Sequence, residues 1–242
     1  FPLPRVDAEP RLQAALFDAG LTLIRTAAGA ETVAAPVLTR HGVRFDRAAR
    51  VDAMAAADAY ATAEWLGADW FGSERTVRQL FVSSYRFALG MLPPLDRDAA
   101  LLARVADDIY DSYQDTRHWS VYPDVIPALD ALLGAGIAMA VVSDWGHGLG
   151  AILLELELGR YFRHLVVSSR LGVTKPDPSG FRTALSGLGA RADRTVFIGD
   201  TYVKDVLGAR AAGIAPVLLD RAGTAPSVDC PVVRVLTDVL PL

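Results

Sequence analysis

The sequence contains very little cysteine and lysine. Its 242 residues include one cysteine, Cys230, so no internal disulfide can form. A single thiol fits a reducing compartment, and on this ground we expect a cytoplasmic protein. Positive charge is carried almost wholly by arginine, because the only lysines are Lys175 and Lys204. Lysine offers a compact ammonium and arginine a planar fork, so a retained lysine can mark a site that needs the compact shape. Chance explains Lys204 equally well.

Long hydrophobic runs and blocks of one charge are also missing. The longest apolar stretches, such as residues 137–142, have the length of a strand and not of the roughly 20 residues that cross a membrane. The net charge is only −4, and its even spread leaves no electrostatic footprint for nucleic acid or an anionic membrane. Residues 1–10 contain three prolines and begin with Phe1, which predicts a loose tail rather than a signal peptide. Nothing in the composition indicates an oligomeric state.

Six short apolar runs predict the strands of a buried sheet. They lack polar alternation, as expected for strands that are covered on both faces. The segments between them carry apolar residues at three-to-four spacing, which predicts helices. Alternating strands and helices indicate an α/β fold, a Rossmann-like parallel sheet with helices on both faces. The expected strands are residues 12–17, 137–143, 164–168, 195–198, 215–219 and 232–236, and the expected helices are residues 125–133, 149–158, 180–188 and 203–212.

The segment between the first two expected strands has a different character. Residues 26–118 are rich in Ala, Arg and Asp and contain no convincing strand. We expect several helices there, broken near Gly42, between Gly67 and Gly72, and between Met91 and Pro94. The predicted domains are therefore a core of residues 1–25 and 119–242 and an inserted helical domain of residues 26–118.

Polar side chains follow four of the expected strands where each strand ends. Ligands of open parallel sheets bind outside the carboxyl ends of the strands, so these side chains are expected to converge. A carboxylate there can act as a nucleophile or as a metal ligand. A hydroxyl there can hold an anion. The candidate residues are Asp18 with Gly20 and Thr22, Ser143 with Asp144, Lys175, and Asp200 with Asp205.

Each candidate also has an ordinary structural explanation. Taken alone, Asp18 is as often a turn or cap residue, and Thr22 is more often a turn hydroxyl. Lys175 stands in Lys-Pro-Asp-Pro, where prolines stiffen the loop. An ammonium fixed beside a carboxylate would reduce repulsion toward an anionic substrate. Asp200 and Asp205 could cap and cover a helix, but the pair across a strand-to-helix turn can also face one Mg²⁺ ion.

Together these residues resemble the haloacid dehalogenase superfamily of hydrolases. Asp18 to Thr22 is similar to the first motif of that family, Ser143 to the second, Lys175 to the third and residues 199–205 to the fourth. The resemblance covers residues 12–25 and 119–242, and the inserted helices occupy the place of the family's helical cap. Within the family, the sequence looks closest to the branch of haloacid dehalogenase-like hydrolase domain-containing protein 3.

The resemblance implies a role for each residue. Asp18 would attack a small phosphorylated metabolite and form an aspartyl-phosphate. Ser143, Lys175 and Thr22 would contact the phosphate, and Asp144 belongs to the same phosphate-binding group by its position after Ser143. Mg²⁺ would be held by Asp18, the Gly20 carbonyl and Asp200, with Asp205 supporting the site.

Two positions depart from the pattern of the family. Phosphatases usually carry a second Asp, the general acid and base, where this chain has Gly20. General acid–base catalysis is typically worth about 100- to 10,000-fold in rate. Asp144 stands where Asn is usual, and we expect it to point away from the phosphate and cap the helix that begins near His147. His147 could replace the missing acid, but a surface or helix-start position is the favoured interpretation.

Two other functions stay open beside the phosphatase. A 2-haloacid dehalogenase would attack carbon without a metal, and it also lacks the second Asp. Against it, the fourth motif is acidic, and we find no convincing halide-binding arginine. A non-catalytic phosphate-binding or regulatory protein is the third interpretation. Substrate contacts in the cap are expected among its aromatic residues, although such residues more often form core. The candidates are Trp65, Trp70, Phe71 and Tyr85.

Overall fold

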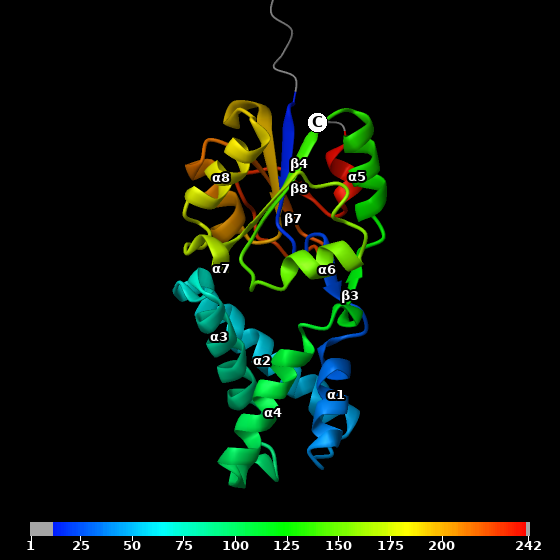
Figure 1. Ribbon diagram of the computed structural model, residues 1–242, viewed down its shortest axis with the longest axis vertical. Helices are drawn as coiled ribbons and strands as arrows, with labels where there is room; N and C mark the ends of the chain where they lie inside the picture. The colour runs from blue at the N-terminus through cyan, green and yellow to red at the C-terminus, as the bar shows by residue number, and fades with distance from the viewer. Residues whose placement is uncertain (1–11, 241–242) are drawn as a thin grey trace, which may run out of the picture.

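A computed structural model describes residues 12–240, and its centre is a six-stranded parallel sheet (Figure 1). The first strand of the chain, β1, lies in the interior of this sheet, with a neighbouring strand on each side. The tail predicted for residues 1–10 lies outside the described residues. The predicted fold class, a parallel sheet with helices on both faces, is confirmed. Across the sheet the order is β5 (His164–Val167), β4 (Ala138–Ser143), β1 (Ala14–Phe17), β6 (Thr195–Gly199), β7 (Ala215–Leu219) and β8 (Val232–Val233).

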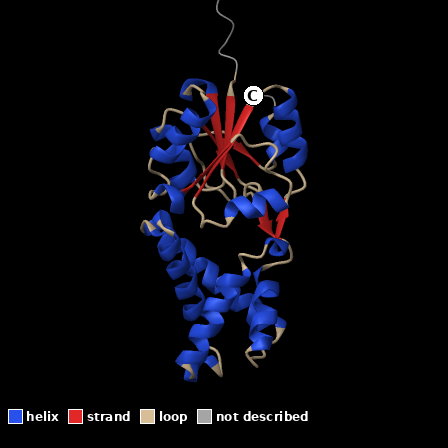
Figure 2. Cartoon of the chain, viewed as in Figure 1, coloured by secondary structure: helices blue, strands red, loops and turns tan. Residues whose placement is uncertain are grey.

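Alternate residues of the strands face two separate cores. Phe17 and Val141 pack on one side, against α5 (Val125–Gly134) and α6 (Leu149–Glu155). Leu16 packs on the other side, against α8 (Ser179–Leu188) and α9 (Leu207–Ala211). This is why the strands are continuous apolar runs, since a sheet covered on both faces has no polar side. Figure 2 shows the strands enclosed between the two helical layers.

Four helices form an insert beyond the carboxyl ends of the strands (Figure 1). They pack around an apolar cluster of their own, which includes Leu80, Leu89 and Ile109. Polar caps mark the beginning of three of these helices, because a side-chain oxygen satisfies an exposed backbone N–H. Asp46, for example, accepts a hydrogen bond from the Ala49 amide at 2.8 Å. The helices of this insert are α1 (Ala30–Arg40), α2 (Arg47–Gly67), α3 (Glu74–Leu89) and α4 (Ala99–Ser112).

A two-stranded antiparallel ribbon joins the insert to the sheet. β2 (Ile24–Thr26) pairs with β3 (Trp119–Val121), and Arg25 lies opposite Ser120. The ribbon holds together the two chain crossings between the core and the insert. We expected no strand from residue 26 to residue 118, and of the ribbon only Thr26 falls within that range. Three-residue strands of this kind carry too little pattern to be recognised from sequence.

Short irregular elements complete the chain. The helix expected over residues 203–212 begins instead as a π-helical turn, η5 (Tyr202–Val206), before α9. The strand expected over residues 232–236 stops at Val233. No helix among the described residues is long and apolar enough to span a membrane. The remaining elements are α7 (Ser168–Leu171) and the 3₁₀ turns η1 (Trp70–Gly72), η2 (Leu95–Arg97), η3 (Thr116–His118), η4 (Ala192–Arg194) and η6 (Leu236–Val239).

Candidate active site

Asp18 lies directly after β1, at the centre of the sheet edge. Its backbone amide donates to the Ile198 carbonyl at 2.9 Å, which continues the ladder of β1 and β6 past the last strand residue. Its side chain is buried, and Oδ1 accepts hydrogen bonds from Ser143 Oγ at 3.0 Å and from Lys175 Nζ at 2.6 Å. Among the described residues, no donor contacts Oδ2 of Asp18. One carboxylate oxygen is thus fixed, and the other is left for a ligand.

Lys175 links Asp18 to Asp205. Its ammonium is buried and donates to Asp18 Oδ1 at 2.6 Å and to Asp205 Oδ1 at 2.7 Å. Burial alone would lower the pKa of Lys175, but the charges of Asp18, Asp205 and Asp144 outweigh it and raise that pKa. Lys175 therefore stays a cation at the sheet edge.

Asp205 is held in place by the strand-to-helix turn. Its Oδ2 accepts from the Thr201 amide at 2.9 Å. Gly199 makes this position possible, since a Cβ there would lie 2.4 Å from Asp205 Cγ. Burial raises the pKa of Asp205 to about 6, although Lys175 acts to lower it. Each oxygen of Asp205 accepts one hydrogen bond, so Asp205 orients the lysine.

Asp200 adds a further carboxylate to the same edge and lines the same cavity as Asp18. Its pKa is raised well above the ordinary value, first by burial and then by the negative charges of Asp18 and Asp205. Three carboxylates thus share one lysine, which leaves uncompensated negative charge at this point. A bound cation would remove that repulsion.

The donor set suits Mg²⁺ better than an all-protein metal cage. The described residues contain no group of three or more His, Cys, Asp or Glu side chains that could hold a metal. Mg²⁺ usually binds one or two carboxylates and keeps several waters. Asp18, Asp200 and a backbone carbonyl such as that of Gly20 match this requirement.

The loop after Asp18 is fixed from outside the cavity. Arg221 Nη2 donates to the Thr22 carbonyl at 2.8 Å, Nε donates to the Leu21 carbonyl at 3.2 Å, and Nη1 pairs with Asp124 at 3.0 Å. On the cavity side the ring of Trp145 covers Gly20, where a Cβ would meet Cζ3 at 3.0 Å. A general-acid side chain at Gly20 would therefore compete with Trp145 for space.

Three other predicted residues have different surroundings. Asp144 does not cap a helix, because its Oδ1 accepts from the Lys175 amide at 3.0 Å and its Oδ2 from Trp65 Nε1 at 3.0 Å. That expectation was wrong, since α6 begins only at Leu149 with no side-chain cap. Thr22 is fully buried, and its hydroxyl does not reach the cavity. His147 lies outside the cavity lining, in agreement with a surface position.

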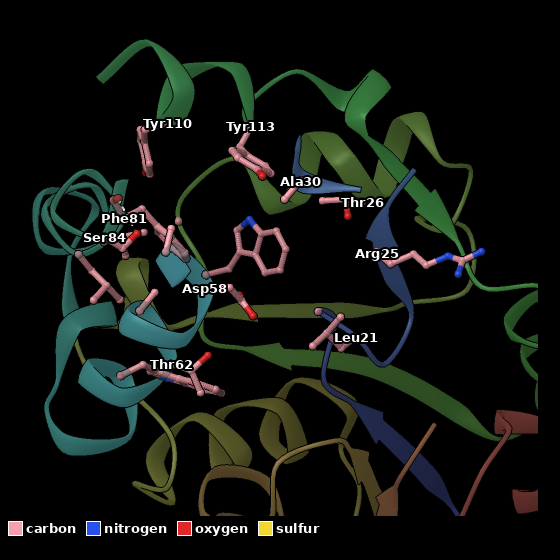
Figure 3. Close-up of a pocket in the computed structure, with 18 of the residues that line it drawn as sticks. Leu21, Arg25, Thr26, Ala30, Asp58, Thr62, Phe81, Ser84, Tyr110 and Tyr113 are labelled. Atoms are coloured by element: carbon pink, nitrogen blue, oxygen red, sulfur yellow. Dashed lines mark hydrogen bonds between the residues drawn. The ribbon is translucent and has the colours of Figure 1, made fainter. Parts of the chain in front are cut away.

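A cavity of about 540 Å³ extends from Asp18 into the insert. Its wall is mainly apolar and aromatic, and it comes from both the sheet edge and helices α2, α3 and α4. Of the aromatic residues expected to contact substrate, Trp65, Phe71 and Tyr85 line it, and Trp70 does not. Phe71 and Tyr85 also belong to the core of the insert, so both interpretations hold for them. Figure 3 shows part of the lining, with Asp58 directed into the cavity and Arg25 directed away from the other labelled side chains.

Several site residues were missed by the sequence analysis. Asp58 interrupts a stripe of cavity-lining residues on α2 that runs at three-to-four spacing from Met54 to Trp65. A carboxylate within such a stripe is a signal that could have been used. Lys204, whose presence chance explained as well as function did, is buried, and its ammonium lies 5.6 Å from the ring centre of Trp65. Trp145 had no signal, because its role depends on contact with Gly20.

A family model described as haloacid dehalogenase-like hydrolase matches residues 12–213. The chain belongs to the haloacid dehalogenase-like hydrolase family. The predicted family and the prediction of a hydrolase are confirmed. Haloacid dehalogenase-like hydrolase domain-containing protein 3 of Danio rerio is 35% identical over 140 residues, which are 57% of this chain and 58% of that protein. The resemblance to that branch is therefore also confirmed.

One further curated protein and one solved structure are also similar to this chain. A glyceraldehyde 3-phosphate phosphatase of Methanopyrus kandleri is 35% identical over 118 residues, 46% of this chain and 48% of that protein. The match thus spans about half the length of these curated relatives. A magnesium-bound HAD-hydrolase from Bacillus subtilis superimposes with a TM-score of 0.73 at 17% identity, covering 95% of this chain and 97% of that one. At this identity the similarity shows the fold alone.

Proposed function

We propose that this hydrolase is a magnesium-dependent phosphatase that uses Asp18 as its nucleophile. The observation that carries the proposal is the buried contact of Lys175 with Asp18 and Asp205, beside a cavity that Asp18 lines. Lys175 fixes one oxygen of Asp18 and leaves the other facing the cavity. Phosphatase names among the relatives support the same reaction. We further propose that the core comprises residues 1–25 and 119–242 and that residues 26–118 form its cap.

In this proposal, Asp18 Oδ2 attacks the phosphorus of a small phosphate monoester. The new O–P bond forms an aspartyl-phosphate, the ester P–O bond breaks, and the alcohol leaves as an oxyanion that takes a proton from water. Water then attacks the aspartyl-phosphate and releases inorganic phosphate. Mg²⁺, held by Asp18, Asp200 and the Gly20 carbonyl, would neutralise charge on the phosphoryl oxygens. Lys175 and Ser143 would add positive charge and a hydrogen bond beside them.

The leaving group receives no proton from a residue at position 20. We therefore propose that the enzyme acts best on esters whose alcohol is a good leaving group. Asp144 is already engaged by Lys175 and Trp65, so it is available neither as an acid nor as a phosphate contact in this arrangement.

Gly20 also supports two rival functions, a metal-free 2-haloacid dehalogenase and a non-catalytic phosphate-binding protein. Burial and the negative charges of Asp18 and Asp205 raise the pKa of Asp200, and a cation that relieves this repulsion favours a metal-dependent reaction over the dehalogenase. Preservation of the whole Asp18, Lys175 and Asp205 contact favours catalysis over binding alone.

A phosphatase screen with and without Mg²⁺ tests the proposal. We expect hydrolysis of aryl phosphates only with Mg²⁺, and a loss of at least about 1,000-fold in kcat for Asp18→Asn, in the range of losses when a nucleophile is removed. Turnover of 2-haloacids by metal-free enzyme would favour the dehalogenase. Phosphate binding without turnover of any ester would favour the non-catalytic protein.

A further inference from the structure

The inner part of the cavity carries an excess of negative charge. Asp18, Asp144 and Asp200 line the cavity at the sheet edge. The other ionisable residues of the lining are Arg25, Glu31, Asp58, Tyr85, Tyr110 and Tyr113. Arg25 does not balance the carboxylates, because its guanidinium lies 4.9 Å from the ring centre of Tyr122 and points away from the cavity (Figure 3). Glu31 has a cation of its own, Arg47, at 3.5 Å. Asp58 is the remaining charge.

Asp58 forms no hydrogen bond or ion pair with any residue from 12 to 240. It lies on the cavity face of α2, between Met54 and Thr62, and its side chain is open to the cavity. Partial burial raises its pKa, although the residue as a whole stays exposed, so that a ligand in the cavity can reach its carboxylate. Its negative charge also raises the pKa of the neighbouring phenols Tyr85 and Tyr113, beyond the effect of burial. A cation of the ligand would supply the missing partner.

Aromatic rings surround the same region. Tyr85 and Tyr113 stack with their ring centres 6.2 Å apart, Trp119 lies 6.1 Å from Tyr113, and Trp145 lies 4.9 Å from Trp119. This series of rings runs from the α3–α4 wall toward the edge where Trp145 covers Gly20. Aromatic faces bind apolar bodies and attract cations through their quadrupoles. Rings around one unpaired carboxylate suit an aromatic ligand that carries an ammonium group.

We propose that the substrate is a phosphate ester of a hydrophobic alcohol or phenol that carries an ammonium group, and that Asp58 pairs with this group. The inference rests on the proposed function for the position of the phosphate beside Asp18. The cavity volume of about 540 Å³ accommodates a ligand of this size. A carboxylate at the same place on the substrate would face Asp58 and Glu31 and be repelled.

Three matched aryl phosphates test this proposal. They are 4-(2-aminoethyl)phenyl, 4-propylphenyl and 4-(2-carboxyethyl)phenyl phosphate, which share one ring and linker and end in a positive, a neutral and a negative group. We expect the ammonium ester to exceed the carboxylate ester by about tenfold or more in kcat/KM, a difference of about 1.4 kcal/mol. Asp58→Asn should reduce that ratio to within about twofold, and Asp58→Glu should restore part of it. Asp52→Asn, an exposed substitution on the same helix outside the cavity, should keep it.

A second readout separates this inference from the proposed function. The phosphonates in which CH₂ replaces the ester oxygen are bound to the wild type and to Asp58→Asn in a calorimeter, where no turnover is needed. Tighter binding of the ammonium phosphonate, lost in Asp58→Asn, supports the substrate class even if every ester resists hydrolysis, a result that would overturn only the phosphatase. Equal affinities for the three charges, or a preference that survives Asp58→Asn, would overturn the substrate class.

Discussion

Gly20 lies two residues after Asp18, and the ring of Trp145 fills the space beside it. A Cβ at Gly20 would approach Trp145 Cζ3 to 3.0 Å, a contact tighter than side chains normally make. The loss of the usual acid is therefore accompanied by a bulky neighbour. Restoring the carboxylate requires removal of that neighbour as well.

We predict that Gly20→Asp alone changes turnover little, because the new side chain is displaced by Trp145. Combined with Trp145→Ala, the same substitution should raise hydrolysis of alkyl phosphates by about 100-fold, since general-acid help matters most for poor leaving groups. Hydrolysis of 4-nitrophenyl phosphate should rise much less. Steady-state kinetics on both esters measure the difference, with Trp145→Ala alone as the control. An equal increase for both esters would show that the added group does not act as the acid.

The sequence predicted which residues meet at the sheet edge better than it predicted which residues line the rest of the cavity. Asp18, Ser143 and Asp200 each end a strand, and parallel strands bring their carboxyl ends to one edge whatever the loops do. The contacts of Trp65 with Asp144 and of Trp145 with Gly20 have no comparable rule. They depend on how the insert and the loops dock, which no local pattern encodes.

At the scale of elements, Lys175 ties the end of β1 to the π-helical turn η5. The loop after α7 carries the lysine, and Asp18 and Asp205 belong to the two elements that it joins. The helix predicted over residues 203–212 missed this detail, because a single π-helical turn of five residues is too short to be distinguished from an α-helix by its apolar spacing. Turns of this kind often occur at functional sites. Here it contains Asp205.

Lys175→Met is predicted to destabilise the fold by about 3–5 kcal/mol at pH 8, because removing one partner leaves buried carboxylates without a cation. The loss should be smaller at pH 5. Asp205 already has a pKa of about 6, and without Lys175 its pKa rises further. The folded state then holds more protons than the unfolded state above about pH 4, so stability falls as the pH rises through this window.

Urea unfolding of metal-free protein at pH 5 and pH 8 measures this effect. Arg191→Gln, which removes an exposed charge, is the matched control and should show no comparable pH-dependent loss. The same loss of stability for Lys175→Met at both pH values would mean that the lysine does not compensate buried carboxylates.

At the scale of the whole molecule, the insert closes over the sheet edge and makes direct contact with it. Trp65 of α2 donates to Asp144, and Glu74 of α3 accepts from the His147 amide at 2.6 Å and from Tyr110 at 2.9 Å. Asp18 and Asp58 consequently line one cavity although they lie 40 positions apart in the sequence. Lys175 is itself buried beside this space, which strengthens its electrostatic effect on Asp18.

The claim that Asp18 is the nucleophile is tested most directly by a covalent adduct. The enzyme is mixed with Mg²⁺ and 4-nitrophenyl phosphate, quenched in acid within the first turnover, digested and analysed by mass spectrometry. The account predicts a phosphoryl group on the peptide that contains Asp18 in the wild type, and its absence in Asp18→Asn. Continued turnover by Asp18→Asn at the wild-type rate, with no adduct on that peptide in either protein, would contradict it.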